Sequence, residues 1–214
     1  MNDNFRHQGL RQKLVQTLRL KGIKDPKVLA AISKIPRHLF LDKAFLDFAY
    51  QDKAFPIAAG QTISHPYTVA FQSELLQIKP YEKVLEVGTG SGYQTAVLLE
   101  LKAHVFSIER QKELYQKTKI FLPKLGYQCM FFYGDGYKGL TNFAPFDKII
   151  VTAGAPFVPE DLVKQLKVGG RMVIPVGQAD KQKMILIDKI SKVNIEQKDL
   201  GDFSFVPLLP KKSQ

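Results

Sequence analysis

Residues 84–92, Val-Leu-Glu-Val-Gly-Thr-Gly-Ser-Gly, decide the fold of this chain. The run from Val84 to Val87 has the length and apolar character of a buried strand, and three glycines follow it at every second position. Residues 93–101 then return to a helix-compatible pattern. A strand, a glycine turn and a helix in this order place backbone N–H groups at a helix N-terminus, where a polar ligand can bind.

The sequence separation between the glycine turn and an acidic residue strengthens this interpretation. Glu109 lies 21 residues after Gly88, at the end of a second strand-like run, residues 104–108. An acid at this position accepts hydrogen bonds from ribose hydroxyls. A glycine-rich turn alone also serves plain chain reversal, but strand, turn, helix and acid together favour a nucleoside-containing cofactor.

The glycine spacing narrows the class of cofactor. The dinucleotide fingerprint Gly-x-Gly-x-x-Gly requires a third glycine at position 93 to pack helix and strand around a pyrophosphate. This chain has Tyr93 there, which makes a dehydrogenase a remote alternative. Gly88, Gly90 and Gly92 resemble instead the first motif of S-adenosylmethionine-dependent methyltransferases, whose cofactor carries no phosphate.

Length and composition predict one domain over residues 1–214 that is stable without covalent cross-links. It divides into a helical N-terminal region with a substrate loop (1–80), a cofactor-binding core (81–178) and C-terminal strands (179–214). Cys129 is the only cysteine, so neither an intramolecular disulfide nor a cysteine-only metal site can form. We expect no metal.

The N-terminus opens on polar residues, and no apolar run approaches the ~18 residues of a membrane span. We therefore expect a soluble cytoplasmic protein with no membrane partner. The formal net charge is +11 with a pI near 9.6. The basic residues are scattered, so we favour a solvated helix face over a nucleic-acid footprint for the densest stretch, residues 6–24.

The chain predicts a doubly wound, mostly parallel α/β sheet with an antiparallel C-terminal edge and an N-terminal helical region. Alternating strands and helices from residue 84 onward indicate the parallel part. Two later strand-like runs, Met184–Ile190 and Phe203–Leu209, have no helix between them and so indicate the antiparallel edge. The remaining expected strands are 84–87, 104–109, 130–134, 147–152 and 171–176. The expected helices include 26–35, 67–78, 93–101, 111–122 and 159–167, with an irregular loop over 50–64.

Two strand ends offer further contacts, because ligands of such sheets bind beyond the carboxyl ends of the strands. Asp135, inside Gly134-Asp135-Gly136, would accept a hydrogen bond from an adenine amino group, although this tripeptide is also favourable turn chemistry. Residues 152–156, Thr-Ala-Gly-Ala-Pro, lack the Asn/Asp-Pro-Pro-aromatic tetrapeptide that is typical of amino-group methyltransferases acting on bases. This argues against base modification.

Ser64 and His65 precede Pro66 at the start of an expected helix. A serine shortly before a helix-starting proline is ordinarily an N-cap, and spacing alone favours that interpretation. His65 beside a proline is more often a surface residue than a base.

The chain as a whole resembles the protein-L-isoaspartate O-methyltransferase family. The matching segments run in family order from about residue 30 to 209. They include Gly60–Tyr67, whose Gln61-Thr62-Ile63-Ser64 is much more specific than the glycine loop. The others are Pro36–Phe40, Ala49-Tyr50, Pro56-Ile57, residues 84–96, Ser107–Arg110, Gly134–Gly136, Ala144–Asp147 and Phe205–Leu208.

The resemblance implies methyl transfer from S-adenosyl-L-methionine to the free α-carboxylate of L-isoaspartyl residues in damaged proteins and peptides. The methyl ester then closes to a succinimide, which initiates repair. Ser64 matches the family's active-site serine, and Thr62, Ile63 and His65 would shape the substrate site. The expected cofactor-binding residues are Glu86, Gly88, Thr89, Gly90, Gly92, Glu109, Arg110, Asp135, Gly136 and Thr152.

The expected partners are isoaspartyl proteins and peptides, with no nucleic acid, and the expected state is a monomer. We hypothesise that Ser64 orients the substrate carboxylate by donating a hydrogen bond and forms no covalent intermediate. Two alternatives stay open. One is a nucleic-acid methyltransferase, which the charge of +11 suggests; the other is a non-catalytic cofactor-binding module that recognises modified proteins.

Overall fold

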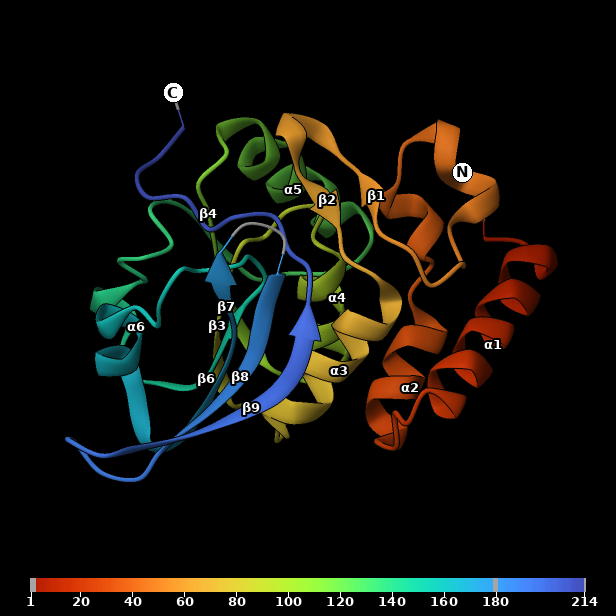
Figure 1. Cartoon of the computed structure of the whole chain (residues 1–214). Helices are drawn as coiled ribbons and strands as arrows, with labels where there is room; N and C mark the ends of the chain where they lie inside the picture. Colours follow the sequence, from red (N-terminus) through yellow and green to blue (C-terminus); the bar gives the residue numbers. More distant parts are fainter. Residues whose placement is uncertain (1–2, 179–180, 214) are drawn as a thin grey trace.

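The computed structural model describes residues 3–178 and 181–213. Its centre is a seven-stranded sheet in the order β5-β4-β3-β6-β7-β8-β9 (Figure 1). The first five strands in this order run parallel, and β8 and β9 follow antiparallel. The expected fold class is confirmed. The strands are β3 Lys83–Val87, β4 His104–Glu109, β5 Met130–Tyr133, β6 Phe146–Val151, β7 Leu166–Gln178, β8 Lys181–Lys189 and β9 Ile195–Phe203.

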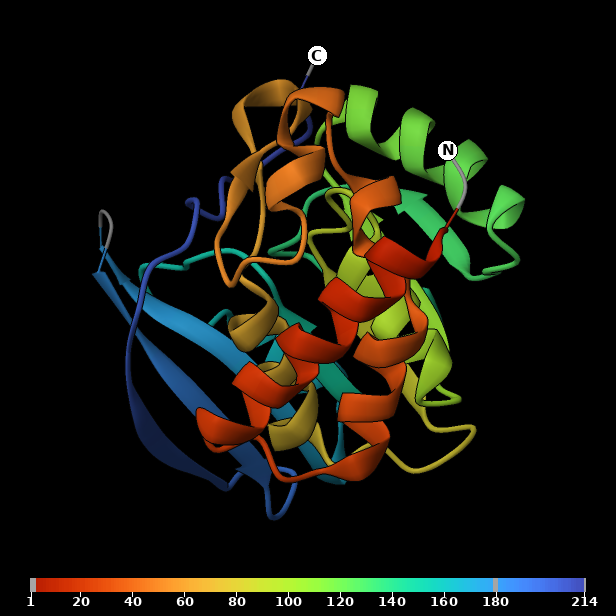
Figure 2. The ribbon, with the colours of Figure 1, turned by 90° about the vertical axis from the view of Figure 1, so that its right-hand side faces the viewer.

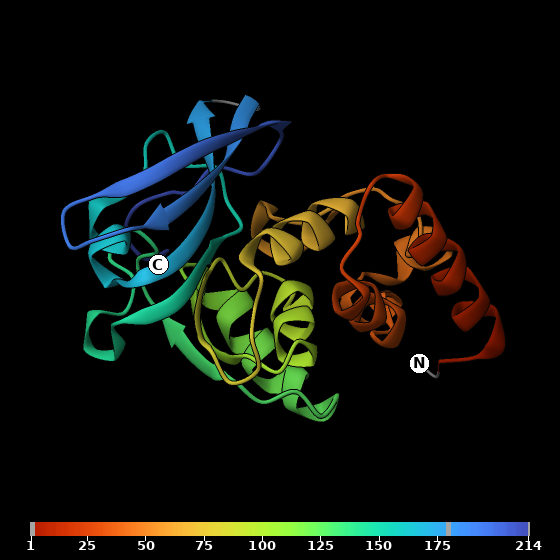
Figure 3. The same cartoon turned by 90° about the horizontal axis from the view of Figure 1, so that it is seen from below.

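Helices cover both faces of the sheet, which explains why its parallel strands are continuous apolar runs. On one face α3 and α4 lie between the sheet and the N-terminal helices α1 and α2 (Figure 3). Asp25 caps α2 as its sequence predicts, accepting a hydrogen bond from the Lys27 backbone N–H at 2.8 Å. The helices are α1 Phe5–Leu20, α2 Pro26–Lys34, α3 Pro66–Leu76, α4 Tyr93–Glu100, α5 Lys112–Lys124 and, on the other face, α6 Glu160–Gln165.

The segment between α2 and α3 is more ordered than the expected loop over 50–64. After two short 3-10 helices, η1 Arg37–Phe40 and η2 Lys43–Phe48, β1 Phe55–Pro56 pairs antiparallel with β2 Thr62–Ile63 (Figure 2). The fully buried Arg37 guanidinium stabilises the segment that leads into this hairpin. It donates hydrogen bonds to the carbonyl oxygens of Ala49 and Lys53 at 3.0 and 2.9 Å. Ser64 directly follows the hairpin and lies two residues before the start of α3.

The expected helix over 159–167 is too long. It ends at Gln165, and β7 begins at Leu166, so the glycine pair 169–170 lies inside a strand. A Cβ at Gly170 would lie 2.8 Å from the Asp147 carbonyl oxygen, close to a register shift between β6 and β7. Gly170 therefore serves close backbone approach at a bulge, whereas Gly169 is in open space and has a φ of +79°. The pair does not form the helix stop that the sequence indicates.

The expected strand over Phe203–Leu209 is wrong. The strand is β9, Ile195–Phe203, whose mostly exposed polar residues give no period-2 signal. Residues 204–209 leave the sheet and cross the carboxyl ends of the parallel strands (dark blue in Figure 1). Two backbone hydrogen bonds tie this crossing to Gly154, and Pro207 cannot continue a ladder. The expected domain boundary at 178/179 falls against residues 179–180, outside the described residues.

Candidate active site

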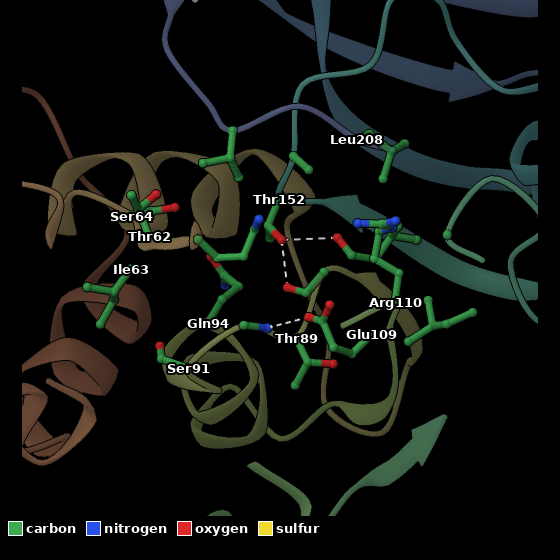
Figure 4. A pocket seen from close by; sticks show the side chains of 18 of the residues that line it. Thr62, Ile63, Ser64, Thr89, Ser91, Gln94, Glu109, Arg110, Thr152 and Leu208 are labelled. Carbon is green, nitrogen blue, oxygen red and sulfur yellow. Dashed lines mark hydrogen bonds between the residues drawn. The ribbon is translucent and has the colours of Figure 1, made fainter. Parts of the chain in front are cut away.

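A pocket lies beyond the carboxyl ends of β3, β4 and β6 (Figure 4), and the empty space in it, including solvent at its opening, is about 770 Å³. Because β3 is flanked by β4 on one side and β6 on the other, the pocket sits where the winding of the sheet reverses, as ligand sites of such folds do. Its walls come from the hairpin, the glycine loop, α3, α4, the strand ends and the crossing C-terminal segment. The lining residues are Gln61–Ser64, Val69, Val87–Ser91, Tyr93, Gln94, Ile108–Arg110, Gly136, Thr152, Ala153 and Val206–Leu209.

The glycine loop that forms the floor of the pocket requires its glycines. Gly88 has a φ of +100°, and a Cβ there would lie 2.5 Å from the Thr152 hydroxyl. That hydroxyl is bonded to the Gly88 and Val87 carbonyl oxygens at 2.7 and 3.0 Å. Thr152 therefore pins the loop to the end of β6, in addition to lining the pocket.

Glu109 lies at the end of β4, as its sequence position predicts, and is 5% exposed. One carboxylate oxygen accepts from the Gly90 backbone N–H and the other from the Gln111 backbone N–H, both at 2.8 Å. Each oxygen keeps acceptor capacity for one further donor. The arrangement fixes a carboxylate at the pocket wall with room for two adjacent hydroxyl groups. Arg110 and Thr89 line the pocket beside it.

Glu86 is placed differently from the expectation, because it does not line the pocket. Its fully buried carboxyl group accepts from the Thr95 and Ser107 hydroxyls, both at 2.6 Å. Ser107 in turn is bonded to the Thr89 hydroxyl at 2.6 Å. Glu86 thus supports the glycine loop from below, and burial raises the pKa of its carboxyl group to about 8.

This raised pKa predicts a pH-dependent stability difference between the wild type and Glu86→Gln. The unfolded carboxyl group ionises near its ordinary pKa, whereas the folded one stays protonated up to about pH 8. The wild type therefore loses about 1.4 kcal/mol of unfolding free energy per unit of rising pH between the two values, relative to the non-titrating variant. Denaturant unfolding of both proteins from pH 5 to pH 8 measures this difference, and parallel pH profiles would contradict it.

Asp135 does not line the pocket, although its neighbour Gly136 does. The Asp135 carboxylate accepts from the Tyr137 backbone N–H at 2.9 Å and from the Lys211 backbone N–H at 2.8 Å. It therefore anchors the C-terminal segment, and each oxygen keeps acceptor capacity for one further donor, so the adenine contact stays a prediction. Gly92 does not line the pocket. A Cβ at this position would lie 2.7 and 2.8 Å from side-chain atoms of Thr118 and Leu122.

Ser64 is not the cap of α3. The N-cap residue is His65, whose side chain makes no capping bond, and the Tyr67 backbone N–H is instead bonded to the Asp52 carboxylate at 2.8 Å. Among residues 3–178 and 181–213, the Ser64 side chain has no hydrogen-bond partner. Its hydroxyl group is therefore available to a ligand.

Ser64 and Thr62 lie side by side at the mouth of the pocket (Figure 4). Both also line a second, outer recess together with Ala54, His65, Thr68, Thr152, Ser204, Phe205 and Val206. His65 is exposed and faces this outer recess only, with Nδ1 3.1 Å from the Asp52 carbonyl oxygen. Ile63 is 3% exposed and lines the inner pocket.

Two parts of the pocket wall are not predictable from local sequence pattern. Residues 206–209 read as a strand because they are apolar, yet those side chains cover the pocket. The position of Gln94 in the sequence pattern does not distinguish it from an ordinary polar residue of a helix. Both parts depend on which segments the fold brings together.

Asp3, His7 and His38 bring potential metal-ligand atoms within 4.8 Å of one another. Arg11 already holds the Asp3 carboxylate through two hydrogen bonds, at 3.0 and 2.9 Å. The rings of His7 and His38 stack with centroids 3.8 Å apart, so their in-plane lone pairs do not converge on one ion. This cluster is better explained as packing between α1 and η1.

The sheet order, the glycine loop and the ribose-spaced acid define a class I methyltransferase. Residues 9–213 match the family model described as Protein-L-isoaspartate(D-aspartate) O-methyltransferase (PCMT). The chain belongs to this family.

Two curated relatives are similar to this chain over its whole length. It is 66% identical to a protein-L-isoaspartate O-methyltransferase of Christiangramia forsetii and 60% identical to one of Flavobacterium johnsoniae, with complete coverage of both sequences in each case. A solved protein-L-isoaspartate O-methyltransferase superposes with a TM-score of 0.84 at 31% identity, covering 92% of this chain and 65% of that one. A Plasmodium falciparum structure described as a putative member, in complex with S-adenosyl-L-homocysteine, gives 0.80 at 26% identity, covering 93% and 98%. Among the described residues, no helix is long and apolar enough to cross a membrane.

Proposed function

We propose that this chain transfers a methyl group from S-adenosyl-L-methionine to the free α-carboxylate of L-isoaspartyl residues in proteins and peptides. The resulting ester closes to a succinimide, which can reopen as normal aspartate. One observation carries the proposal at the level of the site: the Ser64 hydroxyl, without a partner in the described residues, stands between the inner pocket and the outer recess. A donor at this boundary can hold a carboxylate of the substrate toward the inner pocket.

The inner pocket fits an adenosyl cofactor without phosphates. Glu109 offers two carboxylate oxygens to the ribose hydroxyls, and the apolar side chains of Ile108, Leu208 and Leu209 offer surfaces for the adenine ring. The Plasmodium relative, which holds the demethylated cofactor in its structure, supports this assignment. When bound, the cofactor supplies an electrophilic methyl group on a sulfonium ion.

The substrate needs little activation by the protein. An α-carboxylate is ionised at neutral pH, since the pKa of such groups is about 3.5, and no general base is required. Attack by an anion on a cationic centre removes charge, so alignment and exclusion of water supply most of the acceleration. Good positioning contributes roughly 7–11 kcal/mol. Ser64 supplies one fixed hydrogen bond to the attacking carboxylate and keeps its own proton.

The outer recess is suited to a polar peptide. The hydroxyl groups of Thr62, Ser64, Thr68 and Ser204 line it, together with the imidazole of His65. We propose that these groups contact the backbone on either side of the isoaspartyl residue. We also propose a monomeric cytoplasmic enzyme without a nucleic-acid substrate.

Transfer of labelled methyl groups tests the function. The protein is incubated with labelled S-adenosyl-L-methionine and an isoaspartyl peptide, the same peptide with normal aspartate, or RNA. We expect base-labile label on the isoaspartyl peptide alone. Label on RNA, with binding that weakens as salt rises, would establish the nucleic-acid alternative instead. Cofactor binding without label on any substrate would favour a non-catalytic module.

A further inference from the structure

Gln94 lines the inner pocket and carries a buried polar atom that no described residue satisfies. The side chain lies in the first turn of α4 and is 7% exposed. Its Oε1 atom is buried and has no hydrogen-bond partner within residues 3–178 and 181–213. A buried acceptor without a donor costs free energy. Such an atom in the wall of a ligand pocket indicates that the donor comes from the ligand.

The orientation of this amide is fixed by two neighbouring groups. The Ser73 hydroxyl donates to the Val69 carbonyl oxygen at 2.7 Å, because a carbonyl group can only accept. The Ser73 oxygen is then left to accept, and Gln94 Nε2 donates to it at 2.9 Å. With the Ser73 proton donated to Val69, a flipped amide would place two acceptors against each other. Oε1 is therefore held as an acceptor in a side chain that lines the pocket, and its partner must present an N–H or O–H group.

The position of Gln94 along the pocket indicates which group of the ligand is the donor. Glu109 marks the ribose end, and Thr62 and Ser64 mark the end where the methyl group is delivered. Figure 4 shows Gln94 between these two groups of side chains. Glu109 is the sole carboxylate among the described lining residues. A cationic amine at the methionine end therefore has no acidic partner in this wall and depends on neutral acceptors.

We infer that Gln94 accepts a hydrogen bond from the α-ammonium group of the cofactor's methionine moiety, with Ser73 as the residue that orients it. The inference rests on the proposed function and adds a cofactor-binding residue to it. Anchoring the ammonium group fixes how far the methyl group projects toward Ser64. The N–H groups of the bound peptide are the other possible donors, and the experiment separates the two sources.

Calorimetric titration of the wild type, Gln94→Met and Ser73→Ala tests the inference with two ligands. S-adenosyl-L-homocysteine carries the α-ammonium group, whereas 5′-methylthioadenosine is a thioether nucleoside without the amino-acid part. Gln94→Met is expected to bind S-adenosyl-L-homocysteine about 10- to 100-fold more weakly, as for a hydrogen bond to a charged group. Its affinity for 5′-methylthioadenosine is expected to be unchanged. Ser73→Ala, which keeps the acceptor but frees the amide, is expected to show a smaller loss for the first ligand only.

Three results would overturn the inference or its foundation. Equal losses for both ligands would mean that Gln94 only supports the shape of the pocket. Unchanged affinity for both ligands, with a raised KM for the isoaspartyl peptide, would assign the Oε1 acceptor to the peptide. Failure of the wild type to bind S-adenosyl-L-homocysteine would contradict the proposed function itself, whatever the variants do.

Discussion

Ser64→Ala is expected to lower kcat for an isoaspartyl peptide about 100-fold, the effect of a misplaced reacting group. Its affinity for S-adenosyl-L-homocysteine is expected to stay unchanged, because the hydroxyl group lies at the pocket mouth, away from the ribose-binding carboxylate. Single-turnover methyl transfer and calorimetric titration measure the two quantities.

Asp52→Ala is the matched control for Ser64, since Asp52 and not Ser64 provides the acceptor at the start of α3. Loss of a helix cap costs about 1 kcal/mol of unfolding free energy. We expect this loss in Asp52→Ala and none in Ser64→Ala. A Ser64→Ala protein with lowered stability and lowered cofactor affinity would return the residue to a capping role.

Glu109→Ala is expected to produce the opposite pattern. If the proposed ribose assignment holds, the variant loses two charge-assisted hydrogen bonds to the ribose. It also leaves the backbone N–H groups of Gly90 and Gln111 without their acceptors. Each such bond contributes about 1.5–3 kcal/mol, so the dissociation constant for the cofactor should rise about 100-fold or more. At saturating cofactor, kcat is expected to stay close to the wild-type value, because Glu109 does not touch the reacting atoms.

Glu109→Gln separates the two contributions of this residue. Its amide oxygen can still accept from Gly90, so the glycine loop keeps its anchor while one ribose bond and the charge are lost. We expect an intermediate dissociation constant. Equal affinity of wild type, Glu109→Gln and Glu109→Ala would contradict the ribose assignment.

The sequence was sufficient for the parts of the fold that depend on local pattern. The parallel strands are buried on both faces, so β3, β4 and β6 stand out as apolar runs. Positive φ angles at Gly88 and Gly90 make glycine necessary in the loop, and this requirement is visible as spacing. The position of Glu109 at the end of β4 was predictable because the distance between the loop and the next strand end is set by one helix and one strand.

The contacts that local pattern does not predict have a different cause, because they concern partners brought together by tertiary structure. Glu86 lies in β3 and Asp135 follows β5, yet the Glu86 carboxyl group is bonded to Thr95 and Ser107, and one Asp135 oxygen is bonded to the Lys211 backbone N–H. Such partners lie 9 to 76 positions away in the chain. Ser64 lost its apparent capping role to Asp52 for the same reason. No local pattern contains these contacts.

The most direct test of the central claim is to follow an isoaspartyl peptide over time with the protein and S-adenosyl-L-methionine, separating its products by chromatography and mass spectrometry. We expect a methyl ester to form first on the isoaspartyl α-carboxylate. A succinimide follows, and then a rising fraction of the normal aspartyl peptide, while a peptide made with aspartate stays unmodified. An isoaspartyl peptide that remains unmethylated, with cofactor demonstrably bound, would contradict the account.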